Sequence, residues 1–132
     1  MLISVDPSNG LAIYAQIVRQ VKFAIASGAV LPGELVPSVR ELAKQVAVNP
    51  NTVSRAYREL QSDNVLETVR GTGLEVTKAA PKKCRSDRVA MIRERLRLVL
   101  TEAQQSQLDT DEIRTLTEAE LSRLNGTQGE AS

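Results

Sequence analysis

Residues 49–57 have the sequence Asn-Pro-Asn-Thr-Val-Ser-Arg-Ala-Tyr, at the centre of a longer stretch, residues 37–77, that decides the fold. Asn49 is a residue type that caps helix N-termini, and Pro50 suits the first helical position, where its missing amide hydrogen costs nothing. We therefore predict a helix over residues 50–62. Its apolar residues recur at helical spacing and mark the face that packs on the core: Val53, Ala56, Tyr57 and Leu60.

A second helix is predicted immediately upstream. Ser38 and Glu41 have the spacing of a capping box, in which each side chain binds the other residue's backbone amide. Pro37 discourages an earlier helix from continuing here, and the predicted helix ends near Val46. Only residues 47–49 then separate it from the helix over residues 50–62. Two short helices joined by so tight a turn form a helix-turn-helix.

Downstream of these helices the pattern is that of a β-hairpin. Residues 65–69 and 74–77 are strand-like, and a Gly-rich turn at residues 70–73 separates them. This hairpin is the wing of a winged helix-turn-helix. Upstream, residues 2–5 are predicted as a short strand and residues 12–27 as an amphipathic helix. The predicted fold class is mainly α with a small β-wing, and the winged domain occupies residues 1–78.

The remainder of the chain is predicted to be a C-terminal two-helix hairpin. Residues 79–86 are expected to form a basic linker, and residues 125–132 a flexible tail. Between them, residues 87–124 form two helices with apolar seams. A helical hairpin has no second layer to cover such seams, so we expect this region to hold a homodimer together. The alternative is that it docks on the winged domain of the same chain.

The net charge of +1 conceals a segregation of charge. Residues 79–100 carry seven Lys or Arg against two acidic residues, whereas residues 101–132 carry seven acidic residues against two Arg. This order favours packing of the first C-terminal helix against the second, within one chain or between two. Phosphate contact depends on local charge, so a nearly neutral total argues only weakly against DNA binding.

The composition excludes several classes of function. The chain has no His, no nucleophile elbow and no phosphate loop, so we expect no enzyme, no cofactor and no metal site. Aromatic residues make up only 2%, which argues against a stacking platform for single-stranded nucleic acid. The single cysteine cannot form an internal disulfide, and no apolar run is long enough to span a membrane. We expect a cytoplasmic protein without a membrane partner.

Three ordered motifs resemble the DNA-binding domain of the GntR family of bacterial transcription regulators. They lie at residues 35–43, 48–60 and 70–73, and the resemblance covers about residues 13–77. Residues 49–57, together with a short two-helix tail, are similar to the YtrA-like subgroup. The resemblance implies a sequence-specific transcription regulator that binds a palindromic operator in double-stranded DNA as a homodimer.

The resemblance further implies a repressor, with a transporter operon as its target. The alternative is a winged-helix module that binds protein or RNA without regulating transcription. The sequence identifies no small-molecule effector and makes no pocket for one evident.

DNA contacts are implied at the positions that match the family's motifs. Arg40 matches a DNA-contacting Arg and Thr52 a DNA-contacting Thr near the start of the recognition helix, while Arg70 and Gly71 match a wing tip that enters the minor groove. Side chains at a helix N-terminus can reach base edges in the major groove, where Asn pairs well with adenine and Arg with guanine. The predicted set is completed by Ser38, Asn49, Asn51, Ser54, Arg55, Arg58 and Thr72.

Structural alternatives exist for several of these residues. Ser38 and Asn49 are helix caps whether or not they touch DNA. Arg55 has Glu59 one turn further on and could form a surface ion pair with it. Residues 70–73 could be an ordinary hairpin turn. A basic cluster next to the wing is either a solvated linker or a phosphate clamp: Lys82, Lys83, Arg85 and Arg88.

The chain departs from the family pattern in its recognition helix. Many relatives have Arg at the positions of Pro50 and Ser54, so this helix lacks two cationic contacts. We expect modest intrinsic affinity, which Arg58 compensates in part.

Overall fold

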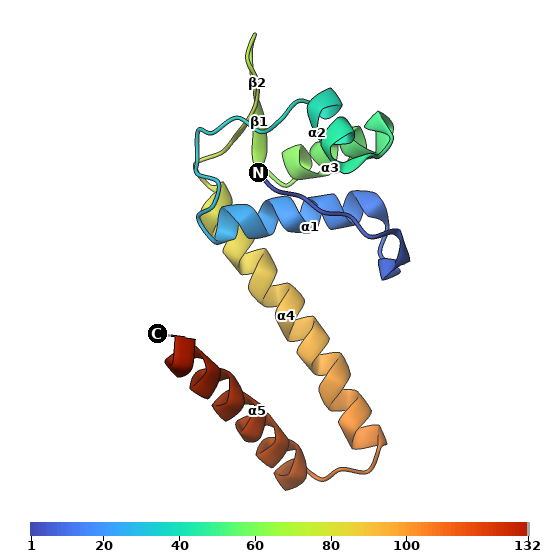
Figure 1. Cartoon of the computed structure of the whole chain (residues 1–132), viewed down its shortest axis with the longest axis vertical. Helices are drawn as coiled ribbons and strands as arrows, with labels where there is room; N and C mark the ends of the chain where they lie inside the picture. Colours follow the sequence, from blue (N-terminus) through green and yellow to red (C-terminus); the bar gives the residue numbers. More distant parts are fainter. Residues whose placement is uncertain (132) are drawn as a thin grey trace. The chain divides into compact units, whose positions relative to one another are not determined.

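The computed structural model describes residues 1–131, and their side chains as far as Gly126 (Figure 1). The chain divides into two compact units, Met1–Ala90 and Met91–Ser132. The described elements are, in order, η1 (Pro7–Asn9), α1 (Ile13–Ala26), α2 (Val39–Val46), α3 (Pro50–Ser62), β1 (Leu66–Val69), β2 (Gly73–Val76), α4 (Ala80–Gln105) and α5 (Thr110–Ala131). The predicted fold class, mainly α with a small β-wing, is confirmed.

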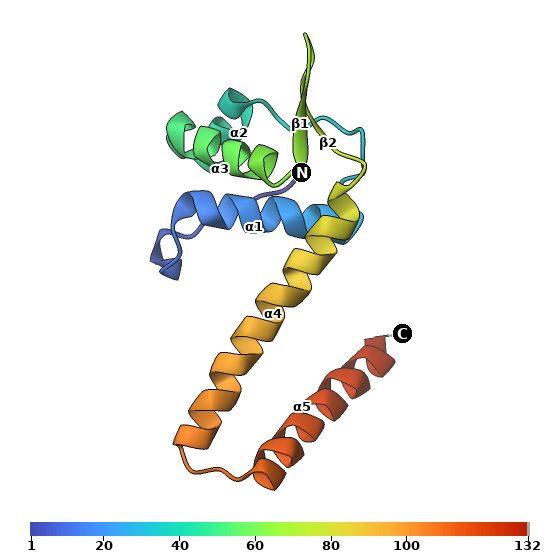
Figure 2. The same cartoon turned by 180° about the vertical axis from the view of Figure 1, so that it is seen from behind.

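The helix α3 is central to the first unit. It packs against α1, α2 and β1, and both views show α1 running beneath α2 and α3 (Figure 2). All four residues of its predicted apolar face are buried, with Tyr57 the most accessible at 2%. They join side chains such as Ile17 of α1 and Leu42 of α2 in one aliphatic cluster. Burial of a Val or Leu side chain contributes on the order of 1.5–3 kcal/mol, so Val53 and Leu60 in particular fix α3 in place.

The N-terminal segment forms no strand, contrary to the sequence prediction. Residues 1–6 alternate between partly buried and exposed positions, as a strand would, but no strand of the described chain pairs with them. Two glutamine side chains of α1 take that role instead. The amide of Gln16 binds both the N–H and the C=O of Asp6, at 2.8 Å each, and Gln20 binds both backbone groups of Ser4. The extended segment therefore satisfies its backbone without a sheet.

The wing is an antiparallel hairpin, as predicted. Leu66 pairs with Val76 and Val69 with Gly73, at the two ends of the register. On its other side β2 contacts the approach to α2, because Val36 N–H donates to the Leu74 carbonyl and Val76 N–H to the Glu34 carbonyl, both at 2.9 Å. The base of the wing is therefore fixed to the helices.

The first two turns of α4 replace the predicted linker at residues 79–86. The helix begins at Ala80, and Ala80 and Cys84, one turn apart, are completely buried in the core of the first unit. The sequence prediction was wrong because it inferred a linker from the basic side chains of this segment. Those of Lys82, Lys83 and Arg85 point outward and are exposed. The helix instead packs on the core through the small residues Ala80 and Cys84, which lie at helical spacing.

The second unit is helical beyond the point where a tail was predicted. Asp109 and Glu112 form a capping box at the start of α5, with the Glu112 N–H donating to Asp109 Oδ1 at 2.8 Å. From there α5 continues to Ala131, so the predicted flexible tail at residues 125–132 is helical over its described part, and Ser132 lies outside the described residues. The apolar seams of both helices are largely exposed: Ile92, Leu96, Val99, Leu116, Leu121 and Leu124. In the described part of the chain, no helix is both long and apolar enough to cross a membrane.

A partly buried charge cluster joins three helices of the first unit. The Lys22 ammonium of α1 lies 2.8 Å from Asp63 at the end of α3 and 3.0 Å from Asp87 of α4, and Lys83 also pairs with Asp87 at 3.2 Å. Burial by itself lowers the pKa of Lys22, but its hydrogen bonds to the two carboxylates outweigh burial and raise it. Burial tends to raise the pKa of Asp87, and the bonds to Lys22 and Lys83 bring it below its ordinary value.

We predict that Asp87→Asn lowers the free energy of unfolding at pH 7 by about 1 kcal/mol, the upper end for a partly exposed ion pair. The Asp87 pKa is depressed in the folded chain, so this contribution is present above pH 3.8, the ordinary value, and is lost as the pH falls through the lower folded value. Denaturant unfolding at pH 7 and at about pH 3 measures the difference.

The matched control is Asp111→Asn, which removes the exposed pair with Arg114. It should change stability by less than about 0.5 kcal/mol. An Asp87→Asn effect that remains undiminished at the acidic pH would contradict the prediction.

Candidate nucleic-acid interface

The capping box at the start of α2 forms as predicted and places Arg40. The Glu41 N–H donates to the Ser38 hydroxyl at 3.1 Å, and the Ser38 N–H donates to the Glu41 carboxylate at 3.3 Å. The Tyr57 hydroxyl donates to the Pro37 carbonyl at 2.7 Å and ties the same turn to α3. With the helix start held from both sides, Arg40 projects into solvent from its first turn.

The turn between α2 and α3 depends on a strained residue. Ala47 has φ 55° and ψ 49°, the left-handed conformation that glycine adopts more easily. It ends α2 and allows the Val48 N–H to donate to the Ala43 carbonyl at 3.0 Å. Asn49 then caps α3, since its side-chain oxygen accepts the Asn51 N–H at 2.8 Å. This cap leaves the donor hydrogens of the Asn49 amide nitrogen available to a ligand.

The solvent-exposed face of α3 carries the residues that the sequence predicts to contact DNA. Asn51, Arg55 and Arg58 are exposed, while Thr52 and Ser54 are half-buried on the flanks of the same face. A shallow hollow of about 340 Å³ lies beside this face, lined by Asn51, Thr52 and Arg55 together with Ile13 and Tyr14 of α1. The structure thus brings three predicted contacts together around one depression.

Arg55 does not form the ion pair with Glu59 that the spacing allowed. Its guanidinium instead lies over the Tyr14 ring, with Cζ 3.7 Å from the ring centroid. The sequence does not identify Tyr14 as a site residue, because its neighbours in α1 indicate only that it belongs to an amphipathic helix. Among the described residues, no carboxylate forms an ion pair with Arg40, Arg58 or Arg70 either. These cations are available to an anionic ligand.

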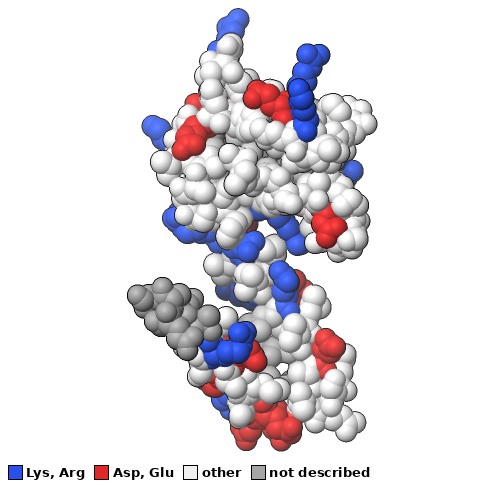
Figure 3. All heavy atoms as spheres, in the orientation of Figure 1, with Lys and Arg blue, Asp and Glu red and all other residues white. Residues whose placement is uncertain are grey.

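The wing tip is exposed and has the geometry of a tight turn. Gly71 has φ 79° and the Thr72 N–H donates to the Val69 carbonyl at 3.0 Å. A residue with a Cβ would be strained at Gly71, so glycine is favoured there. Arg70 and Thr72 flank it in solvent. Figure 3 shows basic side chains projecting from the end of the first unit where the wing lies.

The basic cluster after the wing is partly engaged within the chain. Lys83 pairs with Asp87, and the Arg88 guanidinium lies 4.5 Å from the centroid of the Phe23 ring. Lys82 and Arg85 point into solvent. Because all four stand on a helix rather than a linker, their positions are fixed relative to the winged domain.

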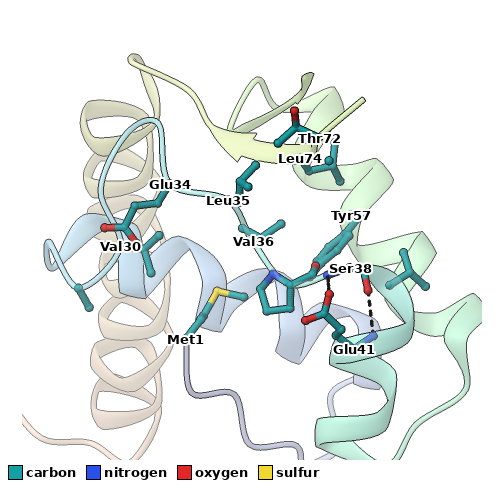
Figure 4. A pocket seen from close by; sticks show the side chains of 14 residues that line it. Met1, Val30, Glu34, Leu35, Val36, Ser38, Glu41, Tyr57, Thr72 and Leu74 are labelled. Carbon is teal, nitrogen blue, oxygen red and sulfur yellow. Dashed lines mark hydrogen bonds between the residues drawn. The ribbon is translucent and has the colours of Figure 1, made fainter. Parts of the chain in front are cut away.

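An open pocket of about 680 Å³ separates the wing from α2, although the sequence made no pocket evident (Figure 4). Leu35, Val36 and Leu74 line it alongside Met1. Several of its polar groups already have partners within the chain, because Glu41 and Tyr57 make the bonds given above and the Glu34 carboxylate accepts the Leu31 N–H at 3.2 Å. The described residues contain no cluster of His, Cys, Asp and Glu able to hold a metal ion.

Comparisons with known proteins agree with this geometry. A family model for bacterial regulatory proteins of the gntR family matches residues 13–76. The HTH-type transcriptional repressor YtrA of Bacillus subtilis is 36% identical over 112 residues, which are 85% of this chain and 86% of that protein. A GntR family transcriptional regulator from Listeria monocytogenes superposes with a TM-score of 0.70 and 31% identity, covering 85% of this chain and 97% of its own.

A third comparison includes DNA. The DNA-binding domain of AraR, in a crystal structure with operator ORX1, matches with a TM-score of 0.53 and 29% identity over 58% of this chain and 96% of its own.

The strained turn generates a stability prediction. Ala47→Gly should raise the free energy of unfolding by about 1 kcal/mol, because it removes the Cβ that makes the left-handed conformation costly. Denaturant unfolding checks this value. The control, Ala43→Gly in the middle of α2, should lower stability because it adds backbone freedom to a helix and removes a buried methyl group. A loss of stability in Ala47→Gly would show that the turn is not strained.

Proposed function

The chain belongs to the GntR family of bacterial regulatory proteins and is a DNA-binding transcription regulator, and we propose that it binds a palindromic operator as a homodimer. In this proposal the N-terminal half of α3 enters the major groove. The observation that carries it is the division of α3 into a fully buried apolar face and an exposed face with Asn51, Arg55 and Arg58. The wing and Arg40 contact DNA on either side of that helix.

Each proposed contact has a distinct chemical part. Arg40 and Arg70 bring charge to phosphates or to the minor groove, where negative potential attracts Arg. Asn51 and Thr52 offer donors and acceptors toward base edges. Ser38 and Asn49 act first as caps, and their side-chain oxygens are occupied by backbone amides. Ser54, Arg58, Gly71 and Thr72 complete the proposed surface.

The exposed seams support the proposal of a homodimer. Leu96 and Val99 of α4 are 50% and 61% exposed, and Leu116 of α5 is 56% exposed. Apolar side chains at this spacing on a helix are normally covered, and a second copy of the same hairpin would cover them with twofold symmetry. We assign DNA binding to residues 1–78 and dimerisation to residues 87–124. A dimer presents two recognition helices, which matches a palindrome.

The regulatory outcome we propose is repression. The relative from Bacillus subtilis is named a transcriptional repressor, and a dimer bound across a promoter would compete with polymerase. A transporter operon is the proposed target, on the basis of the likeness to the YtrA-like subgroup. A regulator of this kind works where the chromosome lies, which supports a cytoplasmic location.

We predict that the protein prefers the DNA upstream of its own gene to random duplex, and that Arg40→Ala weakens that binding about tenfold without changing the oligomeric state. A lost phosphate contact would also reduce the slope of log affinity against log salt by about one. Fluorescence anisotropy across a salt series measures both quantities. Lys44→Ala, an exposed cation in the last turn of the same helix, is the control and should bind as the wild type does. Equal affinity for both duplexes at every salt concentration would refute sequence-specific binding.

A second prediction concerns the proposed dimer. Leu96→Glu places a charge in the seam and should give monomers at micromolar concentration, with operator affinity reduced at least about tenfold because avidity is lost. Sedimentation velocity measures the mass. Leu98→Glu puts the same charge on the opposite side of α4, where Leu98 is 63% exposed, and should leave the dimer intact. A monomeric wild type would show that the hairpin has another role.

A further inference from the structure

The first turn of α1 borders the exposed face of α3 that we propose to contact DNA, and Tyr14 lies there against Arg55. The Arg55 Cζ atom is 3.7 Å from the Tyr14 ring centroid. Carbon atoms of two groups in van der Waals contact lie about 3.5–4.0 Å apart, so the guanidinium rests on the face of the ring. Tyr14 also lines the hollow that Asn51 and Thr52 share with Arg55. It is therefore part of the surface on which the proposed contacts lie.

We propose that Tyr14 is a positioning residue of the DNA interface, whose ring holds the Arg55 guanidinium in place for a phosphate or a base edge. This inference rests on the proposed function, in which Arg55 meets DNA. It adds the start of α1 to a surface otherwise made by α2, α3 and the wing. Tyr14 acts through Arg55 and does not itself need to touch DNA.

Stacking leaves the guanidinium free to bind. A guanidinium carries its five N–H donors in its plane, and a ring against one face blocks none of them. The stack also holds a long side chain still before DNA arrives. Ordering such a side chain on binding costs about twofold to tenfold in affinity, which a prior stack would recover.

Arg55 stacks although a carboxylate is within reach along the helix. Glu59 lies four residues further on, the spacing at which helical ion pairs form. Arginines elsewhere in the chain pair with a carboxylate three residues before them on the helix, as Arg97 does with Glu94 and Arg114 with Asp111. Among the described residues Arg55 forms no ion pair, and its charge is not neutralised before DNA binds.

The local sequence makes this one cation important. Residues 50–57, the first two turns of α3, contain no Lys or Arg other than Arg55. The next, Arg58, lies one turn further from the helix start. A loss of order in the Arg55 side chain would therefore affect the only Lys or Arg within the first two turns of the proposed recognition helix.

The test is a double-mutant cycle in DNA affinity. A preferred duplex is first selected from a randomised pool with the wild-type protein, and dissociation constants are then measured on it. We expect Tyr14→Leu and Arg55→Ala each to weaken binding about fivefold, and Tyr14→Leu to have an effect of less than about twofold in the Arg55→Ala background. Tyr14→Phe keeps the ring and should bind as the wild type does.

Two controls separate positioning from a structural role. Arg58 lies on the same exposed face, and among the described residues the arginine that stacks on Tyr14 is Arg55, so the effects of Tyr14→Leu and Arg58→Ala should multiply. Arg55→Lys keeps the charge but has no flat group to stack, and in that background Tyr14→Leu should again have little effect. Thermal unfolding of every variant confirms that each is folded at the assay temperature. If the Tyr14 ring served only to hold α1 on α3, Tyr14→Leu would reduce DNA affinity by the same factor whichever residue stands at position 55.

The outcomes distinguish the two proposals. Selection of a preferred duplex together with coupled effects of Tyr14 and Arg55 supports both. Selection of a preferred duplex with independent effects overturns the role of Tyr14 and leaves the proposed function standing. Failure of the wild type to prefer any duplex overturns both.

Discussion

The winged domain depends on the burial of one face of α3. Val53, Ala56 and Leu60 are fully excluded from water, and Tyr57 is nearly so. Because this face of α3 packs against α1 and α2, the opposite face of the helix is exposed to solvent. Tyr57 is the one aromatic ring in that face, and burial, with the nearby charge of Glu41, raises its pKa so that the hydroxyl remains a donor to the Pro37 carbonyl. The same contact that fills the core therefore fixes the approach to α2.

Helix caps and DNA contacts draw on the same short polar residues, and the structure separates the two uses. The side-chain oxygens of Ser38 and Asn49 accept backbone amides, so the Ser38 O–H and the Asn49 amide nitrogen are the donors that these residues keep for DNA. The arginines are better placed, because Arg40, Arg55, Arg58 and Arg70 come from α2, α3 and the wing and stand clear of carboxylates in the described chain. The proposed DNA-binding surface therefore has few cations, but none of these four arginines is neutralised by an ion pair within the described chain.

Local chemistry made most of the fold predictable. Capping residues, Pro50 and helical spacing located α2 and α3, and strand-like runs on either side of a Gly-rich turn located the wing, since each signal acts within a few residues. The failures depend on partners distant in the chain. No residue near Cys84 in the sequence indicates that this side chain lies in the core, so the sequence predicts a linker where α4 begins. The N-terminal segment has the alternation of a strand but pairs with glutamine side chains of α1. Tyr14 joined the candidate site only through its contact with Arg55, across α1 and α3.

The burial of Cys84 provides a chemical reporter for the start of α4. The chain has one thiol, it is completely buried, and burial raises its pKa, so it reacts slowly while the helix stays docked. Reaction with a thiol reagent requires α4 to lift away from the core, and its rate measures how often that local opening occurs. Because the start of α4 connects the winged domain to the exposed seams, one alkylation rate can show whether binding at either end restrains the junction.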